Sequence, residues 1–459
     1  MKSSALVQIL VVLLIGTNLS CTKKFLDAKP SSKLIVPNSI EDFQSLLEGD
    51  QIMTETPSLG ELSSDNYFLA YDIWQIYSTT QRNAYIWNKE IFEGQPSTDW
   101  NNLYKQIFFC NIVLEGLERF PVTPENETKW KNCKGMALFI RAYAFYNLAQ
   151  IFAPVFDVSS ANSDLGIPLR LTSDFSAKTE RATVQETYDR VIEDLNSCKA
   201  LCDAAVPTNN MNVTSSPAAL ALLSRVYLSM REYNKAKLAA DTCLTIYNRL
   251  IDYNQVSLTA NSPFPRNSVE VLYRSSIRDG ILNVATGALH TEIDSVLYNS
   301  YDSNDLRKSI FFTKSPTRTG KIIMKGNYYS GIFAFTGLAM DEVYLNRAEC
   351  LARLDRLPEA LNDLNALLIK RWKNGTFVPY ASGTYGDVLQ LVLRERRKEL
   401  IHRGIRWSDL RRLNKEGAGI NLKRSLNGQI FTLLANDLRY VLPIPDEVIA
   451  LTGIPQNIR

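Results

Sequence analysis

The sequence predicts a mainly α fold: a helical repeat scaffold that carries an irregular region, partly β and partly loop. Three observations support this. Apolar residues recur at spacings of three and four over several long segments, the period of half-buried helices. Two segments, 223–244 and 345–368, read as similar pairs of helices. Between them, residues 251–336 are rich in Ser, Thr, Asn, Asp and Tyr, and a polar stretch this long exceeds a simple loop.

The repeat is visible in LSRVYLSMREYNKAKLAADTCL (223–244) and LNRAECLARLDRLPEALNDLNALL (345–368), which differ by two residues in the turn. Both resemble tetratricopeptide units, with Ala236 and Ala360 at the close helix crossing. A third, split unit begins at Arg141, is interrupted after Pro154, and resumes at Thr183. Thr183 and Glu186 there have the spacing of a capping box.

Other helices and strands follow from periodicity and from turn signals. Helices are expected at 40–47, 100–117, 130–152, 183–202, 218–230, 233–248 and within 391–414. Within 391–414, Leu393, Leu400, Ile401 and Trp407 are expected to form a buried stripe, and Arg394, Glu395, Arg397 and Glu399 to form ion pairs at helical spacing. Strand-like runs in the irregular region are VEVLYRS (269–275) and KIIMK (321–325).

The N-terminus has the order of a bacterial secretory signal. Lys2 precedes an apolar run from Ala5 to Ile15, which is too short to span a bilayer. Ser20 before Cys21 predicts lipoprotein processing, although Leu19 stands two places before the cysteine rather than three. We expect a signal peptide at 1–20, a lipidated Cys21 and a tether at 21–38. The alternative is an ordinary secretory signal cut near Ser20.

Composition excludes some classes of function. The formal net charge of the 459 residues is +3 and no long basic run occurs, so the chain lacks the electrostatic footprint of a nucleic-acid-binding protein. The six cysteines after Cys21 lack paired CxxC spacing, which argues against a zinc site or a disulfide framework. We expect most of them to be buried. They are Cys110, Cys133, Cys198, Cys202, Cys243 and Cys350.

Catalytic motifs are scarce. There are two histidines, His290 and His402, no HExxH motif and no glycine-rich phosphate loop. The sequence therefore predicts no catalytic residue, no metal site and no cofactor. Glycoside hydrolysis stays open because it needs only two of the 48 acidic residues. Arg396, Glu399 and Asp409 could form a charged catalytic cluster, but pairing within and between helices is the favoured interpretation.

Aromatic residues are the candidates for ligand binding. A flat ring contacts the apolar C–H face of a sugar, while neighbouring polar side chains bond its hydroxyls. The candidates are Tyr71, Trp74, Tyr77 and Trp87 in the aromatic region 65–87, and Tyr298, Tyr301, Tyr328 and Tyr329 in the irregular region. The alternative is that most of them belong to the core or face a partner protein.

Several motifs agree in order with one family. They are the leader CTKKFLDAKP (21–30), the segment RERRKELIHRGIRWSDLRR (394–412) and the closing YVLPIPDEVI (440–449) with Gln456-Asn457. Together they resemble the SusD/RagB family of outer-membrane nutrient-binding lipoproteins. Two features depart from the family pattern: Ala339 replaces an arginine often found there, and Thr22, Lys23 and Lys24 replace an acidic cluster after Cys21.

The resemblance implies an N-terminal region with helical repeats (39–250), a variable insert (251–336) and a C-terminal region (337–459). It implies a non-enzymatic, lipid-anchored protein of the outer membrane, on the cell surface. Such a protein would bind a nutrient, with an oligosaccharide favoured, and pass it to a SusC-like TonB-dependent transporter. The alternatives are a peptide-binding RagB-like receptor, a surface glycoside hydrolase and a periplasmic repeat scaffold.

Overall fold

The computed structural model describes residues 37–49, 51–279, 282, 291–381, 383 and 386–459. The chain divides into two units, Met1–Ser39 and Ile40–Arg459. The predicted signal peptide (1–20), Cys21 and nearly all of the tether (21–38) lie outside the described residues and stay predictions. His290 lies outside them too.

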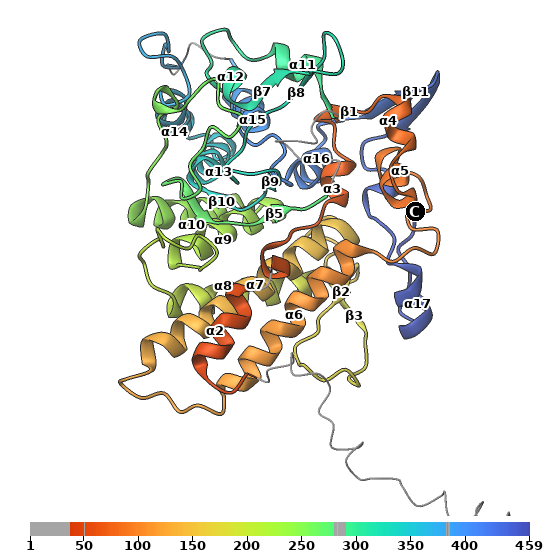
Figure 1. Cartoon of the computed structure of the whole chain (residues 1–459), viewed down its shortest axis with the longest axis vertical. Coiled ribbons are helices and arrows are strands. Elements are labelled where there is room, and N and C mark those ends of the chain that lie inside the picture. The colour runs from red at the N-terminus through yellow and green to blue at the C-terminus, as the bar shows by residue number, and fades with distance from the viewer. Residues whose placement is uncertain (1–36, 50, 280–281, 283–290, 382, 384–385) are drawn as a thin grey trace, which may run out of the picture. The chain divides into compact units, whose positions relative to one another are not determined.

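The second unit is mainly helical, as Figure 1 shows, which confirms the predicted fold class. Its helices are α2 (Ile40–Gly49), α3 (Leu59–Leu62), α4 (Tyr71–Gln75), α5 (Thr79–Tyr85), α6 (Thr98–Leu117), α7 (Glu127–Phe152), α8 (Val184–Leu201), α9 (Ser216–Met230), α10 (Tyr233–Ile246), α11 (Ser295–Asn299), α12 (Arg307–Phe311), α13 (Met340–Arg353), α14 (Leu357–Leu368), α15 (Val388–Glu399), α16 (Arg406–Lys415) and α17 (Asp446–Thr452).

Caps written into the sequence set where several helices begin. The hydroxyl of Thr183 accepts a hydrogen bond from the Glu186 amide, and the Glu186 carboxylate accepts one from the Thr183 amide. The predicted capping box at the start of α8 is thus confirmed. Ser97 caps α6 by accepting from the Trp100 amide, and Ser215 caps α9, where Pro217 occupies the first turn.

The scaffold is a succession of packed helix pairs. Each of α6 to α9 packs against the next helix in the chain, α10 then packs against α13, and α13 packs against α14 and α15. The pairs α9–α10 and α13–α14 are the two predicted repeat units. Ala236 and Ala360 are fully buried, and Ala236 packs with Leu228 and Cys350. These small side chains let neighbouring helices approach closely.

The strands are short and pair in twos. All the pairs are antiparallel: β1 (Tyr67–Phe68) with β6 (Glu292–Ile293), β2 (Leu165–Pro168) with β3 (Arg181–Thr183), β4 (Val271–Tyr273) with β10 (Leu338–Ala339), β5 (Ser276–Ile277) with β9 (Ala334–Phe335), β7 (Phe312–Lys314) with β8 (Ile322–Met324), and β11 (Leu422–Leu426) with β12 (Gln429–Leu433). The two strand-like runs predicted in the irregular region are thus found, as β4 and β8.

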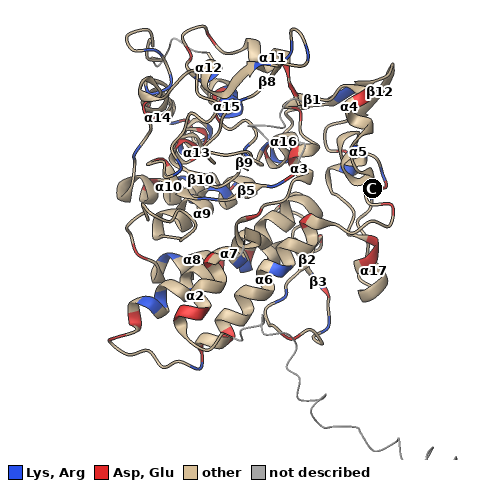
Figure 2. Cartoon of the chain, in the orientation of Figure 1, with Lys and Arg blue, Asp and Glu red and all other residues tan. Residues whose placement is uncertain are grey.

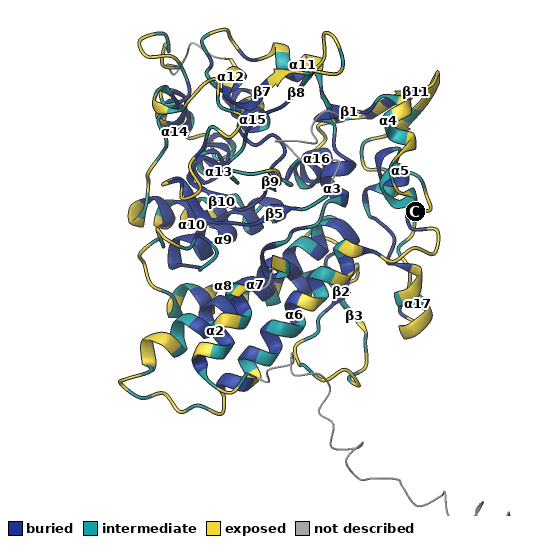
Figure 3. Ribbon diagram, viewed as in Figure 1, coloured by how far each residue is buried: buried dark blue, intermediate teal, exposed yellow. Residues whose placement is uncertain are grey.

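Burial is concentrated in the repeat helices, as Figure 3 shows in dark blue for α7, α9 and α13, while α17 carries exposed residues. The irregular region has an apolar core of its own that includes Tyr253, Phe264 and Phe312. Ile401, from the C-terminal region, packs into that core. Most of the six cysteines after Cys21 were expected to be buried, and five of them are, while Cys202 is half-buried.

Acidic and basic residues are distributed through the whole of the described chain, as Figure 2 shows. Many of them pair inside the protein. Arg141 binds Asp194 through two nitrogens, joining α7 to α8, and Arg225 binds Glu342 in the same way, joining α9 to α13. Buried bidentate pairs of this kind fix the register of neighbouring helices.

The ion pairs expected at helical spacing along α15 are mostly wrong. Glu395 does pair with Lys398 in its own helix, but Glu399 pairs with Arg307 and Arg371, and Arg397 pairs with Asp65 and Asp294. The physical reason is burial: this face of α15 packs against other segments, so its partners come from them. Of the predicted apolar stripe, Leu400, Ile401 and Trp407 are buried and Leu393 is half-buried.

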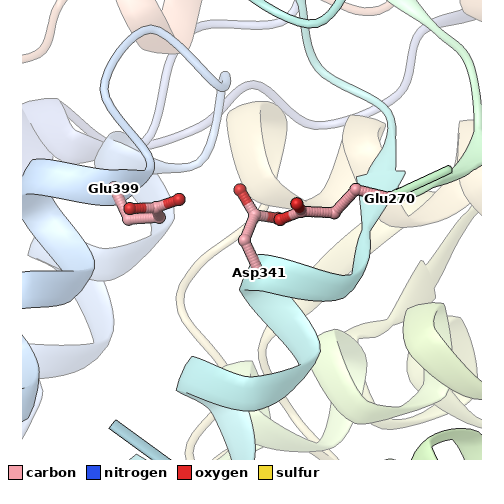
Figure 4. Close-up of side chains that lie close together, drawn as sticks. All are labelled: Glu270, Asp341 and Glu399. Carbon is pink, nitrogen blue, oxygen red and sulfur yellow. The ribbon is translucent and has the colours of Figure 1, made fainter. Parts of the chain in front are cut away.

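A group of three buried carboxylates, Glu270, Asp341 and Glu399, joins the irregular region to α13 and α15 (Figure 4). Each one faces an arginine. Arg371 lies 2.6 Å from Glu270 and 2.7 Å from Glu399, and Arg403 lies 2.8 Å from Asp341. Burial raises the pKa of Glu270 to about 7, and the positive charge of Arg371 opposes that shift. We call these five residues the central ion-pair cluster.

Replacing Arg371 with Met is expected to reduce the free energy of unfolding by about 3–5 kcal/mol, because it leaves the buried Glu270 without its arginine and leaves Glu399 with Arg307 alone. Urea unfolding followed by circular dichroism measures this change. The matched control is Arg394→Met on the exposed face of α15, which is expected to change stability by less than about 0.5 kcal/mol. If R371M and R394M had the same free energy of unfolding, the central ion-pair cluster would not stabilise the fold.

Glu61 in α3 is a second buried carboxylate. It accepts hydrogen bonds from Ser64, Asn66 and the amide of Gly404, each at 3.2 Å. Burial raises its pKa from 4.5 to about 7. His402 lies 3.8 Å away, and burial lowers the pKa of its imidazole to about 4, so Glu61 titrates beside a neutral ring.

The raised pKa of Glu61 gives stability a pH dependence of known sign. The folded state binds the proton more tightly than the unfolded chain, so the stabilisation is fully present below about pH 4.5 and is lost as the pH rises through about 7. The size is ~3 kcal/mol. Urea unfolding measures the free energy of unfolding of the wild type and of Glu61→Gln. Between pH 4 and pH 8, the wild type is expected to lose this amount of stability relative to the variant. A gap that stays constant with pH would contradict the assignment.

Candidate functional site

A cavity of about 470 Å³ lies where three helices begin. Ser58, Ser78 and Ser97 are the residues at the N-termini of α3, α5 and α6, and all three line it. Most of the other lining residues are also polar. The full lining is Ser58, Leu59, Leu62, Ser78, Thr79, Thr80, Gln81, Gln95, Pro96, Ser97, Thr98, Asp99 and Asp279. The cavity therefore presents hydroxyl, amide and carboxylate groups at close quarters.

Two carboxylates belong to the cavity wall. Asp99, in the first turn of α6, accepts hydrogen bonds from the Leu59 amide at 2.8 Å and from the Ser58 hydroxyl at 3.4 Å, which ties α6 to α3. Removal from water raises the pKa of Asp99 to about 7. Asp279 accepts from the amide nitrogen of Gln81 at 2.9 and 3.0 Å. Both carboxylates are thus already held by the protein.

Three of the predicted aromatic residues lie just before α5, and we call them the aromatic edge. Tyr71 and Trp74 stack with ring centroids 5.9 Å apart, and the Trp74 indole donates to the Arg82 carbonyl at 3.1 Å. Tyr77 directly precedes Ser78, which lines the cavity, and both burial and the charge of Asp279 raise the pKa of Tyr77. Tyr71 is exposed, whereas Trp74 and Tyr77 are half-buried.

Three other predicted aromatics are core residues. Trp87 is 2% exposed and donates to the Ser63 carbonyl, Tyr301 is 2% exposed and donates to the Lys398 carbonyl, and Tyr328 is 3% exposed and bonds to Tyr253 and Glu270. In this conformation they offer a ligand no surface.

Tyr298 and Tyr329 are half-buried. Tyr298 lies under Lys308, and Tyr329 lies under Arg274. The eight candidates therefore do not form one site.

The structure accounts for the charged residues that resembled a catalytic cluster. Arg396 binds Asp409 at 2.9 Å, joining α15 to α16, and Glu399 belongs to the central ion-pair cluster, so the predicted structural pairing is confirmed. His402 is fully buried beside Tyr67, at positive φ.

The three carboxylates of the central ion-pair cluster are near enough to one another to be compared with a metal site. Their oxygens lie within 4.8 Å of one another, close enough to hold a cation. Arg371 and Arg403 already supply the positive charge there, so the residues do not fit a metal site.

The polar lining of the cavity was not predicted from the sequence. Its residues come from three helix starts and from Asp279, which stand far apart along the chain. A local signal did exist, since Ser78 and Gln81 form a capping box and Ser97 caps α6. That signal marks where a helix begins, but it does not reveal that three such beginnings meet.

Comparisons with known proteins agree with the fold. Residues 24–228 match a family model described as "Starch-binding associating with outer membrane", and residues 338–457 match the model of the SusD family. Among the described residues, none of the helices has both the length and the apolar character to cross a membrane.

Relatives support the same assignment. A SusD-like protein, P38 of Formosa agariphila, is 24% identical over 400 residues, covering 69% of this chain and 72% of its own length. A SusD superfamily structure from Bacteroides thetaiotaomicron has a TM-score of 0.75 at 23% identity, covering 92% of this chain and all of that one. A SusD-like carbohydrate binding protein from Bacteroides vulgatus has a TM-score of 0.67 at 18% identity, with coverages of 91% and 97%. From its motifs, its fold and these matches, the chain belongs to the SusD/RagB family.

Proposed function

We propose that this protein is a lipid-anchored receptor on the cell surface that binds an oligosaccharide and passes it to a SusC-like TonB-dependent transporter. Family membership supports a role in nutrient binding at the outer membrane. The single observation that carries the ligand class is the polar cavity beside the aromatic edge. Sugars combine hydroxyl groups with apolar ring faces, and these two surfaces match both.

The cavity and the aromatic edge would contact different parts of a sugar. Hydroxyl and amide groups of Ser78, Thr80, Gln81 and Thr98 can exchange hydrogen bonds with sugar hydroxyls. A ring such as Trp74, held by its bond to the Arg82 carbonyl, loses little side-chain entropy when a sugar stacks on it. Several weak contacts of this kind suit a receptor that must also release its ligand.

Replacing Trp74 or Tyr77 with Ala is expected to weaken oligosaccharide binding at least tenfold, because each removes a flat contact surface beside the cavity. Isothermal titration against a glycan panel and a peptide panel measures this effect. Phe175→Ala, at a side chain that is 81% exposed, is the matched control. Binding of peptides but not of glycans would instead favour the RagB-like alternative.

The anchor has a separate test. Replacing Cys21 with Ser is expected to release the protein from the membrane fraction, because acyl chains on this cysteine would supply the attachment. Uptake at limiting oligosaccharide is expected to fall in the same cells. A C21S protein that stays in the membrane fraction, or uptake that does not change, would argue against a lipid-anchored receptor. Protection of the wild type from protease on intact cells would favour a periplasmic scaffold.

A surface glycoside hydrolase is the second candidate, because Asp99 and Asp279 line one cavity and Asp99 has a pKa of about 7. Against it, each carboxylate already accepts hydrogen bonds that hold the fold. Incubation with the bound oligosaccharide, followed by an assay for new reducing ends, separates the two candidates. New ends that disappear in Asp99→Asn would establish the enzyme, and no new ends are expected for the receptor.

A further inference from the structure

Two arginines meet around one tyrosine beside β5. The guanidinium of Arg274 lies over the Tyr329 ring, 5.6 Å from its centroid, and Arg278 donates to the Tyr329 hydroxyl at 3.5 Å. Arg278 also stacks on Phe333 and donates to Gln51 at 2.9 Å. Ser276 stands between the two arginines in the chain. Alternate residues of an extended segment point to the same side. We call Arg274, Ser276 and Arg278 the arginine pair site.

Polar atoms of all three residues lack hydrogen-bond partners among the residues that the structure describes. They are Nε and Nη2 of Arg274, Oγ of Ser276 and Nε of Arg278, all of them buried atoms. Arg274 as a whole is 8% exposed. A buried donor without an acceptor is costly, and more so when it is charged. These three guanidinium nitrogens, which lie beside a hydroxyl, call for an acceptor that is not part of these side chains.

The charge around Arg274 also lacks compensation. Arg141, Arg225, Arg307 and Arg371 are buried as well, but each of them contacts a carboxylate. Arg274 has no such ion pair with any residue that the structure describes. Its pKa is lowered by burial and by the positive charge of Arg266. Arg274 is thus a buried positive charge without a described carboxylate partner, and the rings of Tyr329 and Phe333 lie beside the two arginines.

We propose that the arginine pair site binds an oxyanion, a carboxylate or sulfate group carried by the captured oligosaccharide. Planar guanidinium groups bind both anions with paired, charge-assisted hydrogen bonds. Arg278 and Tyr329 are only half-buried, so the site is accessible from their side. Arg278 directly precedes Asp279 of the cavity wall, which brings the site within reach of a ligand in the cavity. The inference rests on the proposed receptor function and narrows its ligand to acidic glycans.

Sodium sulfate is the simplest probe. Titrated into the purified protein at constant ionic strength, it is expected to raise the melting temperature of the wild type and of the exposed control Arg394→Met in a saturable way. In Arg274→Met and in the less buried Arg278→Met, the apparent affinity for sulfate is expected to fall at least tenfold. Because Arg274→Met also removes an unsatisfied buried charge, it is expected to be no less stable than the wild type without anions. If sulfate raised the melting temperature of both variants with the wild-type affinity, the arginine pair site would not be an anion site. Ordered water would then satisfy its donors.

Matched glycan pairs then identify the source of the anion. The pairs are oligogalacturonide with its methyl ester, and a sulfated galactan oligosaccharide with its desulfated form. The wild type is expected to bind the acidic member of at least one pair at least tenfold more tightly, and R274M and R278M are expected to lose that preference while still binding the neutral member. Equal affinity within both pairs, with sulfate still bound, would mean a free anion only and would overturn the glycan assignment.

Failure of the receptor function has a different signature. It would leave Trp74→Ala without effect on either member of a pair, whereas failure of the arginine pair site leaves that effect intact and removes only the acidic preference.

Discussion

The central ion-pair cluster fixes the irregular region to helices α13 and α15 through buried charges. Glu270 belongs to the irregular region, Asp341 lies in the first turn of α13 and Glu399 ends α15, and all three are buried. Carboxylates in such a place are tolerated only when arginines compensate them. Arg371 bonds to two of the three and also to the Ile251 carbonyl, so one side chain fixes the start of the irregular region to the C-terminal helices.

That attachment determines where the neighbouring strand segment lies. Glu270 directly precedes β4, and the same segment continues through Arg274 and β5 to Asp279. The cluster therefore holds one end of the stretch that supplies both the arginine pair site and a wall of the cavity. Arg424 links segments on the opposite side of the cavity wall, near Leu62. Its guanidinium lies over the Tyr85 and Trp87 rings and donates to the carbonyls of Leu62 and Ser64. It thus joins β11 to the segments around α3 and α5.

Local patterns in the sequence predicted the elements well. Periodicity located helices such as α8, whose buried residues recur on one face, and the Thr183 capping box is a purely local device. The two repeat hairpins followed from the similarity of 223–244 and 345–368. Ion pairing along α15 was predicted with the wrong partners, because Arg307 and Arg371 reach Glu399 from other segments. The spacing of residues within α15 does not indicate such partners from other segments.

The candidate site was predictable only in part, for a similar reason. Trp74 and Trp87 stand in one aromatic segment, yet Trp74 is half-buried in the aromatic edge and Trp87 is enclosed under Arg424. The difference depends on β11, more than 300 residues away in the chain. The arginine pair site could not be predicted, because the sequence does not show which arginines lack a carboxylate partner in the folded chain.

Hydrogen–deuterium exchange of the protein with and without its bound oligosaccharide shows whether the polar cavity at three helix starts, with the aromatic edge beside it, captures the nutrient. We expect slower exchange on binding for the amides of 71–81 and 95–99, with no change in the buried repeat hairpins. Protection that appeared elsewhere, with these two segments unchanged, would contradict this site assignment.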